Sequence, residues 1–241
     1  MTAITIAVLN LSTALTDARI EEALPALQTQ ISRDFALVYR TDAHLVFVPK
    51  TGRPPAGAWW LGVFDNSDQP GALGYHDLTP EGRPFGKVFA ATDLAAGLSW
   101  TVTMSHELLE MLADPDINIT IFYRSSGTAG RLYAYEVCDA PEADAYGYTI
   151  DGVLVSDFVY PAWFQDTSAG DAQFDHAGHI KAPLELLPGG YIGVFDLSGS
   201  GWIQLHPTGA ELHYRDRPRV GSRRERRRTP REQWLRSTVT Y

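Results

Sequence analysis

The chain has little of several residue types, and each shortage excludes a class of protein. One cysteine in 241 residues, Cys138, excludes an internal disulfide framework and a cysteine-rich zinc cluster. No apolar run approaches the roughly 20 residues that a bilayer-spanning helix needs. The first residues, MTAITIAVLNLST, lack the positive flank and the cleavage pattern of a secretory signal. We therefore expect no signal peptide and no membrane span, and a protein made in the cytoplasm.

Positive charge is scarce in the body of the chain and concentrated at its end. Residues 1–214 contain ten Lys and Arg against 26 Asp and Glu, whereas residues 215–241 contain ten Arg against three acids. An Arg-rich segment usually contacts nucleic acid or an acidic protein surface, although it can also be a solvated tail. We expect residues 215–241 to form an extended tail that binds a partner outside the body of its own chain.

The order of patterns along the chain predicts the fold class. Residues 4–11, 44–49 and 59–65 are typical of buried strands, and residues 71–92 indicate two strands joined by a Gly/Pro turn. A helix is expected to begin near Thr16, with apolar residues at helical spacing, and a second to cover residues 98–113. Short strands and loops follow. The sequence predicts an α/β (α+β) protein, a β-α-β-β-β-helix unit with an irregular, β-rich C-terminal part.

The second expected helix carries the most informative pattern. In SWTVTMSHELLEMLADPD, apolar side chains cover most of the helix surface, which indicates a buried helix. The main polar exceptions, Thr103, His106, Glu107 and Glu110, form one stripe. A buried unpaired carboxylate is costly, so a partner is required. His106 and Glu110 project from the same face, and a divalent cation between them would satisfy both. Alternatively, the stripe lines a polar contact with an acidic loop or the tail.

These residues resemble the catalytic half of the metzincin metallopeptidases. The order of elements is similar, and SHELLEMLADPD is similar to the family's H-E-x-x-H helix, in which the glutamate acts as general base on metal-bound water. SDFVYPAWF, residues 156–164, is similar to the family's Met-turn segment. The resemblance implies a metallopeptidase-like domain over residues 1–164, a β/loop part of the same unit over residues 165–214, and Glu107 as the catalytic base. The strand near Gly74–His76 would be the substrate-binding edge.

The chain departs from that pattern in its metal ligands. Glu110 replaces the second histidine, so one imidazole and two carboxylates would hold the metal; zinc accepts this set, and calcium or manganese is also possible. Asp116 stands where the family's third ligand would be. Asp114, which precedes a proline, and the carboxylates of YEVCDAPEAD, Glu136 and Asp139, are alternatives. The expected site is His106, Glu110 and Asp116 around a divalent metal.

A second resemblance covers most of the chain. SHELLEMLADP, YEVCDAPEAD, DGVLVSDFVYPAWF and the terminal GSRRERR are similar to a family of proteins from tailed bacteriophages and bacterial genomes. This similarity implies a virion-associated structural protein, located in the particle or in the host cytoplasm before assembly. The Arg-rich tail would then contact neighbouring subunits or nucleic acid in an oligomeric assembly. The alternative function is an active metal-dependent peptidase that hydrolyses peptide bonds.

Overall fold

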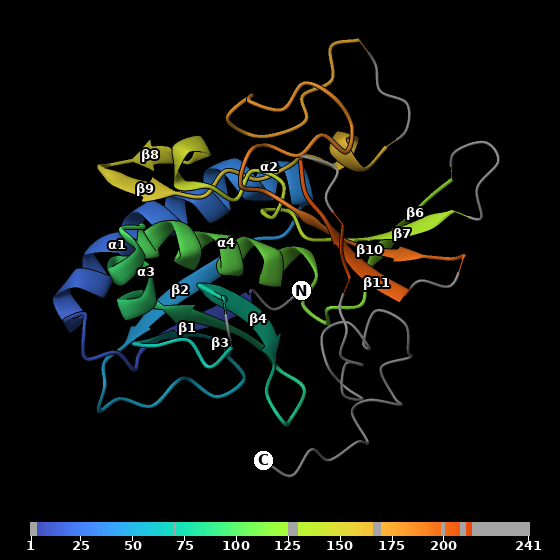
Figure 1. The fold of residues 1–241 in the computed structure, drawn as a ribbon. Coiled ribbons are helices and arrows are strands. Elements are labelled where there is room, and N and C mark those ends of the chain that lie inside the picture. The colour runs from blue at the N-terminus through green and yellow to red at the C-terminus, as the bar shows by residue number, and fades with distance from the viewer. Residues whose placement is uncertain are drawn as a thin grey trace.

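The computed structural model describes residues 4–69, 71–124, 130–165, 170–198 and 201–207, and the backbone of residues 211–213. Within these residues it is a mixed α+β structure, whose arrangement Figure 1 shows. It contains two five-stranded sheets. The predicted fold class is therefore confirmed at this coarse level. The predicted tail, residues 215–241, lies outside the described residues.

The first sheet is built by the N-terminal half of the chain and has the strand order β2-β1-β3-β5-β4. Neighbouring strands are parallel from β2 to β5, whereas β4 is antiparallel to β5. Among the described strands, β4 pairs only with β5, so it forms one edge of the sheet. The strands are β1 (Ile4–Asn10), β2 (Ala43–Val48), β3 (Trp59–Phe64), β4 (Gly74–Leu78) and β5 (Pro84–Phe89). Every strand expected from the sequence in this half is present.

The first helical segment connects β1 to β2. Helix α1 (Asp17–Thr29) begins where the Thr16 hydroxyl accepts the Arg19 N–H, an N-cap that satisfies one of the unpaired donors of the first turn. The same helical segment continues through a π-helical stretch, η1 (Gln30–Phe35), into α2 (Ala36–Tyr39). The sequence predicted the start of this segment but not its π-helical part.

Helix α4 (Trp100–Ala113) follows β5, after the short helix α3 (Ala90–Ala96), and packs on the sheet. Its residues 100–112 are all buried, as the apolar pattern predicted. The close approach requires glycine on β4, since a Cβ at Gly74 would lie 2.8 Å from Glu107 Cγ and from Thr103 Cγ2, both in α4. Contacts this short would force neighbouring atoms to move, so Gly74 allows α4 to lie against β4.

The C-terminal half adds a second, antiparallel sheet of order β12-β11-β10-β7-β6 and a β8–β9 hairpin. The hydrophobic core is shared between the halves, since one cluster of buried side chains extends from Ile6 in β1 to Ile203 in β11. Two 3-10 helices, η2 (Asp144–Tyr146) and η3 (Pro161–Phe164), lie in the connections. The strands are β6 (Thr120–Tyr123), β7 (Arg131–Ala134), β8 (Tyr148–Ile150), β9 (Val153–Val155), β10 (Ile192–Asp196), β11 (Gly201–Leu205) and β12 (Glu211–His213).

In the part of the chain that the structure describes, no helix combines the length and the apolar character that crossing a bilayer requires.

Candidate metal centre

Helix α4 contributes three acidic or imidazole side chains to one buried cluster. His106 and Glu110 stand one turn apart, and His106 Nε2 lies 3.4 Å from Glu110 Oε2. Glu107, between them in the sequence, is also buried, with 4% of its surface exposed. The sequence-based expectation that His106 and Glu110 face the same side of the helix is therefore confirmed.

The loop after β7 brings two further carboxylates against α4. Asp139 Oδ1 lies 3.3 Å from His106 Nε2, and Glu136 has a carboxylate oxygen within 4.8 Å of one of Glu110. The backbone N–H of Cys138, between these two acids, donates to Glu110 Oε1 over 3.1 Å. This hydrogen bond fixes the loop to the helix and leaves Glu110 Oε2 facing the imidazoles.

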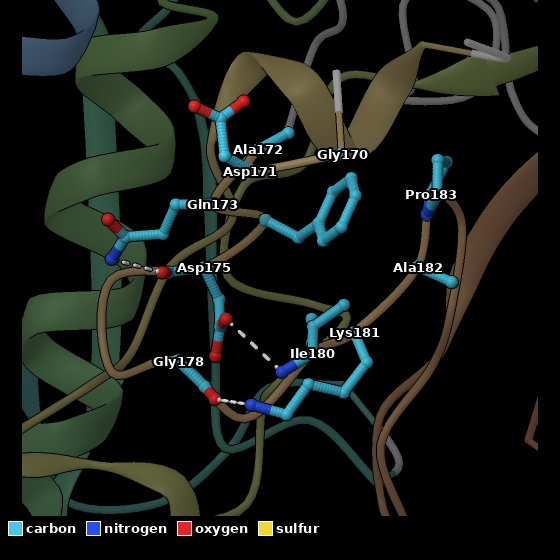
Figure 2. A pocket seen from close by; sticks show the side chains of 11 residues that line it. Gly170, Asp171, Ala172, Gln173, Asp175, Gly178, Ile180, Lys181, Ala182 and Pro183 are labelled. Carbon is cyan, nitrogen blue, oxygen red and sulfur yellow. Dashed lines mark hydrogen bonds between the residues drawn. The ribbon is translucent and has the colours of Figure 1, made fainter. Parts of the chain in front are cut away.

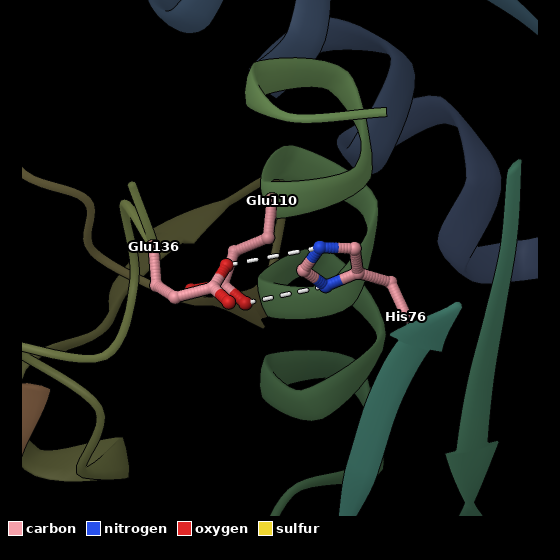
Figure 3. Close-up of side chains that lie close together, drawn as sticks. All are labelled: His76, Glu110 and Glu136. Atoms are coloured by element: carbon pink, nitrogen blue, oxygen red, sulfur yellow. Dashed lines mark ion pairs between the residues drawn. The ribbon is translucent and has the colours of Figure 1, made fainter. Parts of the chain in front are cut away.

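His76 completes the cluster from β4, across from the helix. Its Nδ1 lies 3.5 Å from Glu110 Oε2 and 3.5 Å from Glu107 Oε2, and its Nε2 lies 3.7 Å from Glu136 Oε2. Figure 3 shows the His76 ring reaching from the strand toward the two carboxylates. His76 is fully buried, yet neither ring nitrogen has a hydrogen-bond partner. No motif in the sequence singled out His76 as a ligand, because it belongs to a strand far from the helix along the chain.

The separations within the cluster fit metal ligands better than hydrogen-bonded pairs. Distances of 3.3–3.7 Å between ring nitrogens and carboxylate oxygens exceed those of charge-assisted hydrogen bonds, about 2.7–2.9 Å. Ligands at about 2.0–2.2 Å from a tetrahedral zinc ion lie roughly 3.3–3.5 Å from one another. Two groups have ligand atoms within 4.8 Å of each other, His106–Glu110–Asp139 and His76–Glu110–Glu136. The described residues therefore contain buried groups that could hold a divalent metal.

Burial and charge shift the protonation of these groups. Burial would lower the pKa of His106, but the combined attraction of Glu110 and Asp139 outweighs burial and holds that pKa well above the ordinary value. Burial would raise the pKa of Glu110, but the combined attraction of His106 and His76 outweighs burial and holds that pKa well below its usual range. Burial raises the pKa of the neighbouring Glu142 to about 8, despite the positive charge of His106. Glu110 is thus a carboxylate at neutral pH, whereas Glu142 is a neutral acid.

A second acid with a raised pKa lies beside Glu107. Burial raises the pKa of Asp93, in α3, to about 7, although the Thr103 hydroxyl donates to its carboxylate over 2.9 Å. Negative charge on Asp144 and on Glu107 raises the pKa of Asp93 further. The acidic environment thus extends along α4 from the metal-ligand groups to Asp93.

The structure does not bring Asp116, the third ligand expected from the sequence, into either group. The helix ends at Ala113, and the Asp114 carboxylate accepts the N–H groups of Asn118 and Ile119, at 3.0 and 2.9 Å. These hydrogen bonds hold the chain in a turn after the helix, and Asp116 lies in that turn. The two groups that could hold a metal contain instead the alternative carboxylates, Asp139 and Glu136.

The described residues also form a pocket of about 460 Å³, separate from this cluster. It is lined by residues 170–175, 178 and 180–183, none of which belongs to the metal-ligand groups. Figure 2 shows the Asp175 carboxylate directed at the backbone N–H of Ile180, and it also accepts the N–H of His179. Since Asp175 is occupied by the loop's own backbone, we assign this pocket no role in the metal centre.

Comparison of the chain with protein-family models, with curated proteins and with solved structures finds no match.

Proposed function

We propose that the protein is a metal-dependent hydrolase of the peptidase type, built on a metzincin-like unit. The observation that carries the proposal is the buried group His106, Glu110 and Asp139 with a further carboxylate, Glu107, on the same helix. The donor set, one imidazole nitrogen and two carboxylate oxygens, suits zinc first and manganese or calcium as alternatives. A divalent ion held there would polarise a carbonyl group as a Lewis acid.

Glu107 is the proposed general base. Its Oε2 is buried and has no hydrogen-bond partner, so this oxygen is available to a water molecule rather than to the protein. In peptide hydrolysis, the water oxygen bonds to the carbonyl carbon and its proton goes to Glu107. The C–N bond then breaks, and Glu107 returns the proton to the departing amine nitrogen. The product carboxyl group and amine together account for the added water.

The position of β4 supports a peptide substrate. It is an edge strand, and it also carries His76 into the cluster beside Glu107. An extended peptide can pair with an edge strand through main-chain hydrogen bonds, which would carry its carbonyl groups past the site. The side chains of His106 and Asp139 are each 7% exposed and that of Glu107 is 6% exposed, whereas those of Glu110 and His76 are 1% exposed.

The test is the variant Glu107→Gln, assayed on an unfolded protein in the presence of zinc, manganese or calcium. An amide cannot accept the proton, so we expect turnover to fall by at least 100-fold while the metal content stays unchanged. Glu81→Gln, at an exposed turn, is the matched control and should keep full activity. Wild-type protein that binds metal but cleaves nothing, or a Glu107→Gln variant that is fully active, would contradict the proposal.

A role in a virion is a second proposal, and it is compatible with the first. It is supported by the resemblance to phage and prophage proteins and by the ten arginines of residues 215–241, which a peptidase does not need. Contacts of this tail with packaged nucleic acid would weaken steeply with salt, because each neutralised phosphate releases counterions. If the chain is catalytically inactive, the metal would serve only to tie α4 to the loop after β7, in a structural protein of the particle.

A further inference from the structure

We propose that the centre is dinuclear: a second divalent ion binds to His76, Glu110 and Glu136, and Glu110 lies between the two ions. This inference rests on the metal centre proposed above and adds to it the ligands from β4. The two ligand groups have only Glu110 in common, and each supplies one imidazole and one further carboxylate of its own. A single ion at His106, Glu110 and Asp139 leaves the second group unexplained.

The geometry places one oxygen at the junction of both groups. Glu110 Oε2 is the atom that lies 3.4 Å from His106 Nε2 and also 3.5 Å from His76 Nδ1. Glu110 Oε1 is already occupied by the Cys138 N–H. The side chain therefore cannot turn its two oxygens freely, and Oε2 is held between the two imidazoles. A carboxylate shared between neighbouring ions is the arrangement that a two-metal site requires.

The buried state of His76 is the second observation. Its side chain is 1% exposed, both ring nitrogens face carboxylates at 3.5–3.7 Å, and neither nitrogen has a hydrogen-bond partner. A buried polar group without hydrogen bonds costs about 1–3 kcal/mol, so such groups call for an explanation. Coordination through one ring nitrogen would explain that nitrogen, since a metal ion accepts its lone pair, and the other nitrogen would keep its proton toward the carboxylate that faces it.

The supply of ligands also suits two ions. The cluster contains four buried carboxylates, those of Glu107, Glu110, Glu136 and Asp139. Two of them, Asp139 and Glu136, belong to different ligand groups, so each proposed ion has a carboxylate of its own beside the shared Glu110. Two-metal sites occur in hydrolases, where the pair stabilises both the attacking and the leaving group.

The experiment uses the full-length chain, stripped of metal with a chelator and checked for retained secondary structure by circular dichroism. It is titrated with Mn²⁺ alone, and bound ions are counted by electron paramagnetic resonance. We expect two ions per chain and a spectrum with exchange coupling between them. One ion per chain, or two ions without coupling, would overturn the inference.

Variants assign the ions to their ligands. Glu136→Gln keeps the side-chain volume and should retain one ion while losing the coupling, and His76→Ala should do the same. Asp139→Asn should lose the other ion, whereas Glu81→Gln should still bind two. Should His76→Ala fail to fold, Glu136→Gln decides the question alone. Two coupled ions in Glu136→Gln would overturn the assignment.

The outcomes separate this inference from the proposed function. Two coupled ions in a protein that cleaves no peptide would overturn the peptidase proposal and leave the dinuclear centre in place. One ion in an active peptidase would overturn the dinuclear centre alone. Protein that binds no Mn²⁺ at all would overturn both.

Discussion

Replacing Gly74 with alanine should displace the proposed catalytic base without touching a metal ligand. The new Cβ would lie 2.8 Å from Glu107 Cγ, Glu107 Oε1 and Thr103 Cγ2, whereas ordinary contacts begin at 3.4 Å, so these atoms must move by about 0.6 Å. Gly74 is in β4 with a backbone conformation that alanine accepts. We expect a stability loss of about 1–3 kcal/mol from overpacking. A misplacement approaching 1 Å can cost about 100-fold in turnover, and we expect a loss of about 10–100-fold.

The assay compares turnover and metal content of Gly74→Ala with those of Gly170→Ala. A Cβ at Gly170 meets nothing within 4 Å, so this control should match the wild type in both measurements. We expect Gly74→Ala to lose activity while it keeps its bound metal. Full activity in Gly74→Ala would refute the placement of Glu107 as base. Loss of metal together with activity would show that the substitution disrupts the whole centre rather than the base alone.

Three further predictions concern stability and the tail. Asp65→Asn should destabilise the fold by about 1 kcal/mol near pH 7. Hydrogen bonds from Ser12, Thr13 and the Ala14 N–H lower the pKa of Asp65, so its contribution to stability is present above the ordinary aspartate pKa and is lost as the pH falls below that value. Urea unfolding at pH 7 and pH 3 measures this loss. A mutant as stable as the wild type at pH 7 would contradict this. Burial, together with Asp175, raises the pKa of Asp157 to about 8, so the folded state holds a proton that the unfolded chain releases. The stability therefore falls as the pH rises from about 4 to 8. Asp157→Asn should lessen that fall in thermal melts at pH 5 and pH 8, and an unchanged fall would exclude Asp157 as its source. Deletion of residues 215–241 should leave the body folded and its metal bound while abolishing assembly or nucleic-acid binding. Circular dichroism, metal analysis and sedimentation would measure these three properties. A truncated chain that unfolds would mean that the tail belongs to the core.

Much of the fold was predictable because periodicity depends on local sequence. The alternation and apolar runs of residues 4–65 indicated three strands and the helix between them, and the mostly apolar surface of the helix around SHELLEML indicated that it is buried. The π-helical stretch η1 was not predictable, because a π-helix has no distinct composition and is selected by packing around it. Helix α3 was missed because its seven residues give too short a pattern.

The candidate site was only half predictable, for a related reason. His106, Glu107 and Glu110 share one helix, so their spacing placed them together. His76 reaches the cluster only through the pairing of β4 with β5, and nothing in one sequence gives that pairing. Asp116 was expected as a ligand from the spacing after the helix. Asp114 instead accepts two backbone N–H groups, and the carboxylates that lie with Glu110 in the two groups are those of the loop. A signal was present in YEVCDAPEAD, where Glu136 and Asp139 flank Cys138.

Anomalous diffraction tests the proposed metal centre most directly. Crystals of the full chain, grown with zinc present, would be measured on both sides of the zinc absorption edge. The account predicts an anomalous peak within coordination distance of His106 Nε2, Glu110 Oε2 and Asp139 Oδ1, at about 2.0–2.2 Å from each. No peak at the cluster, with the His106 and Glu110 side chains turned away from one another, would contradict it.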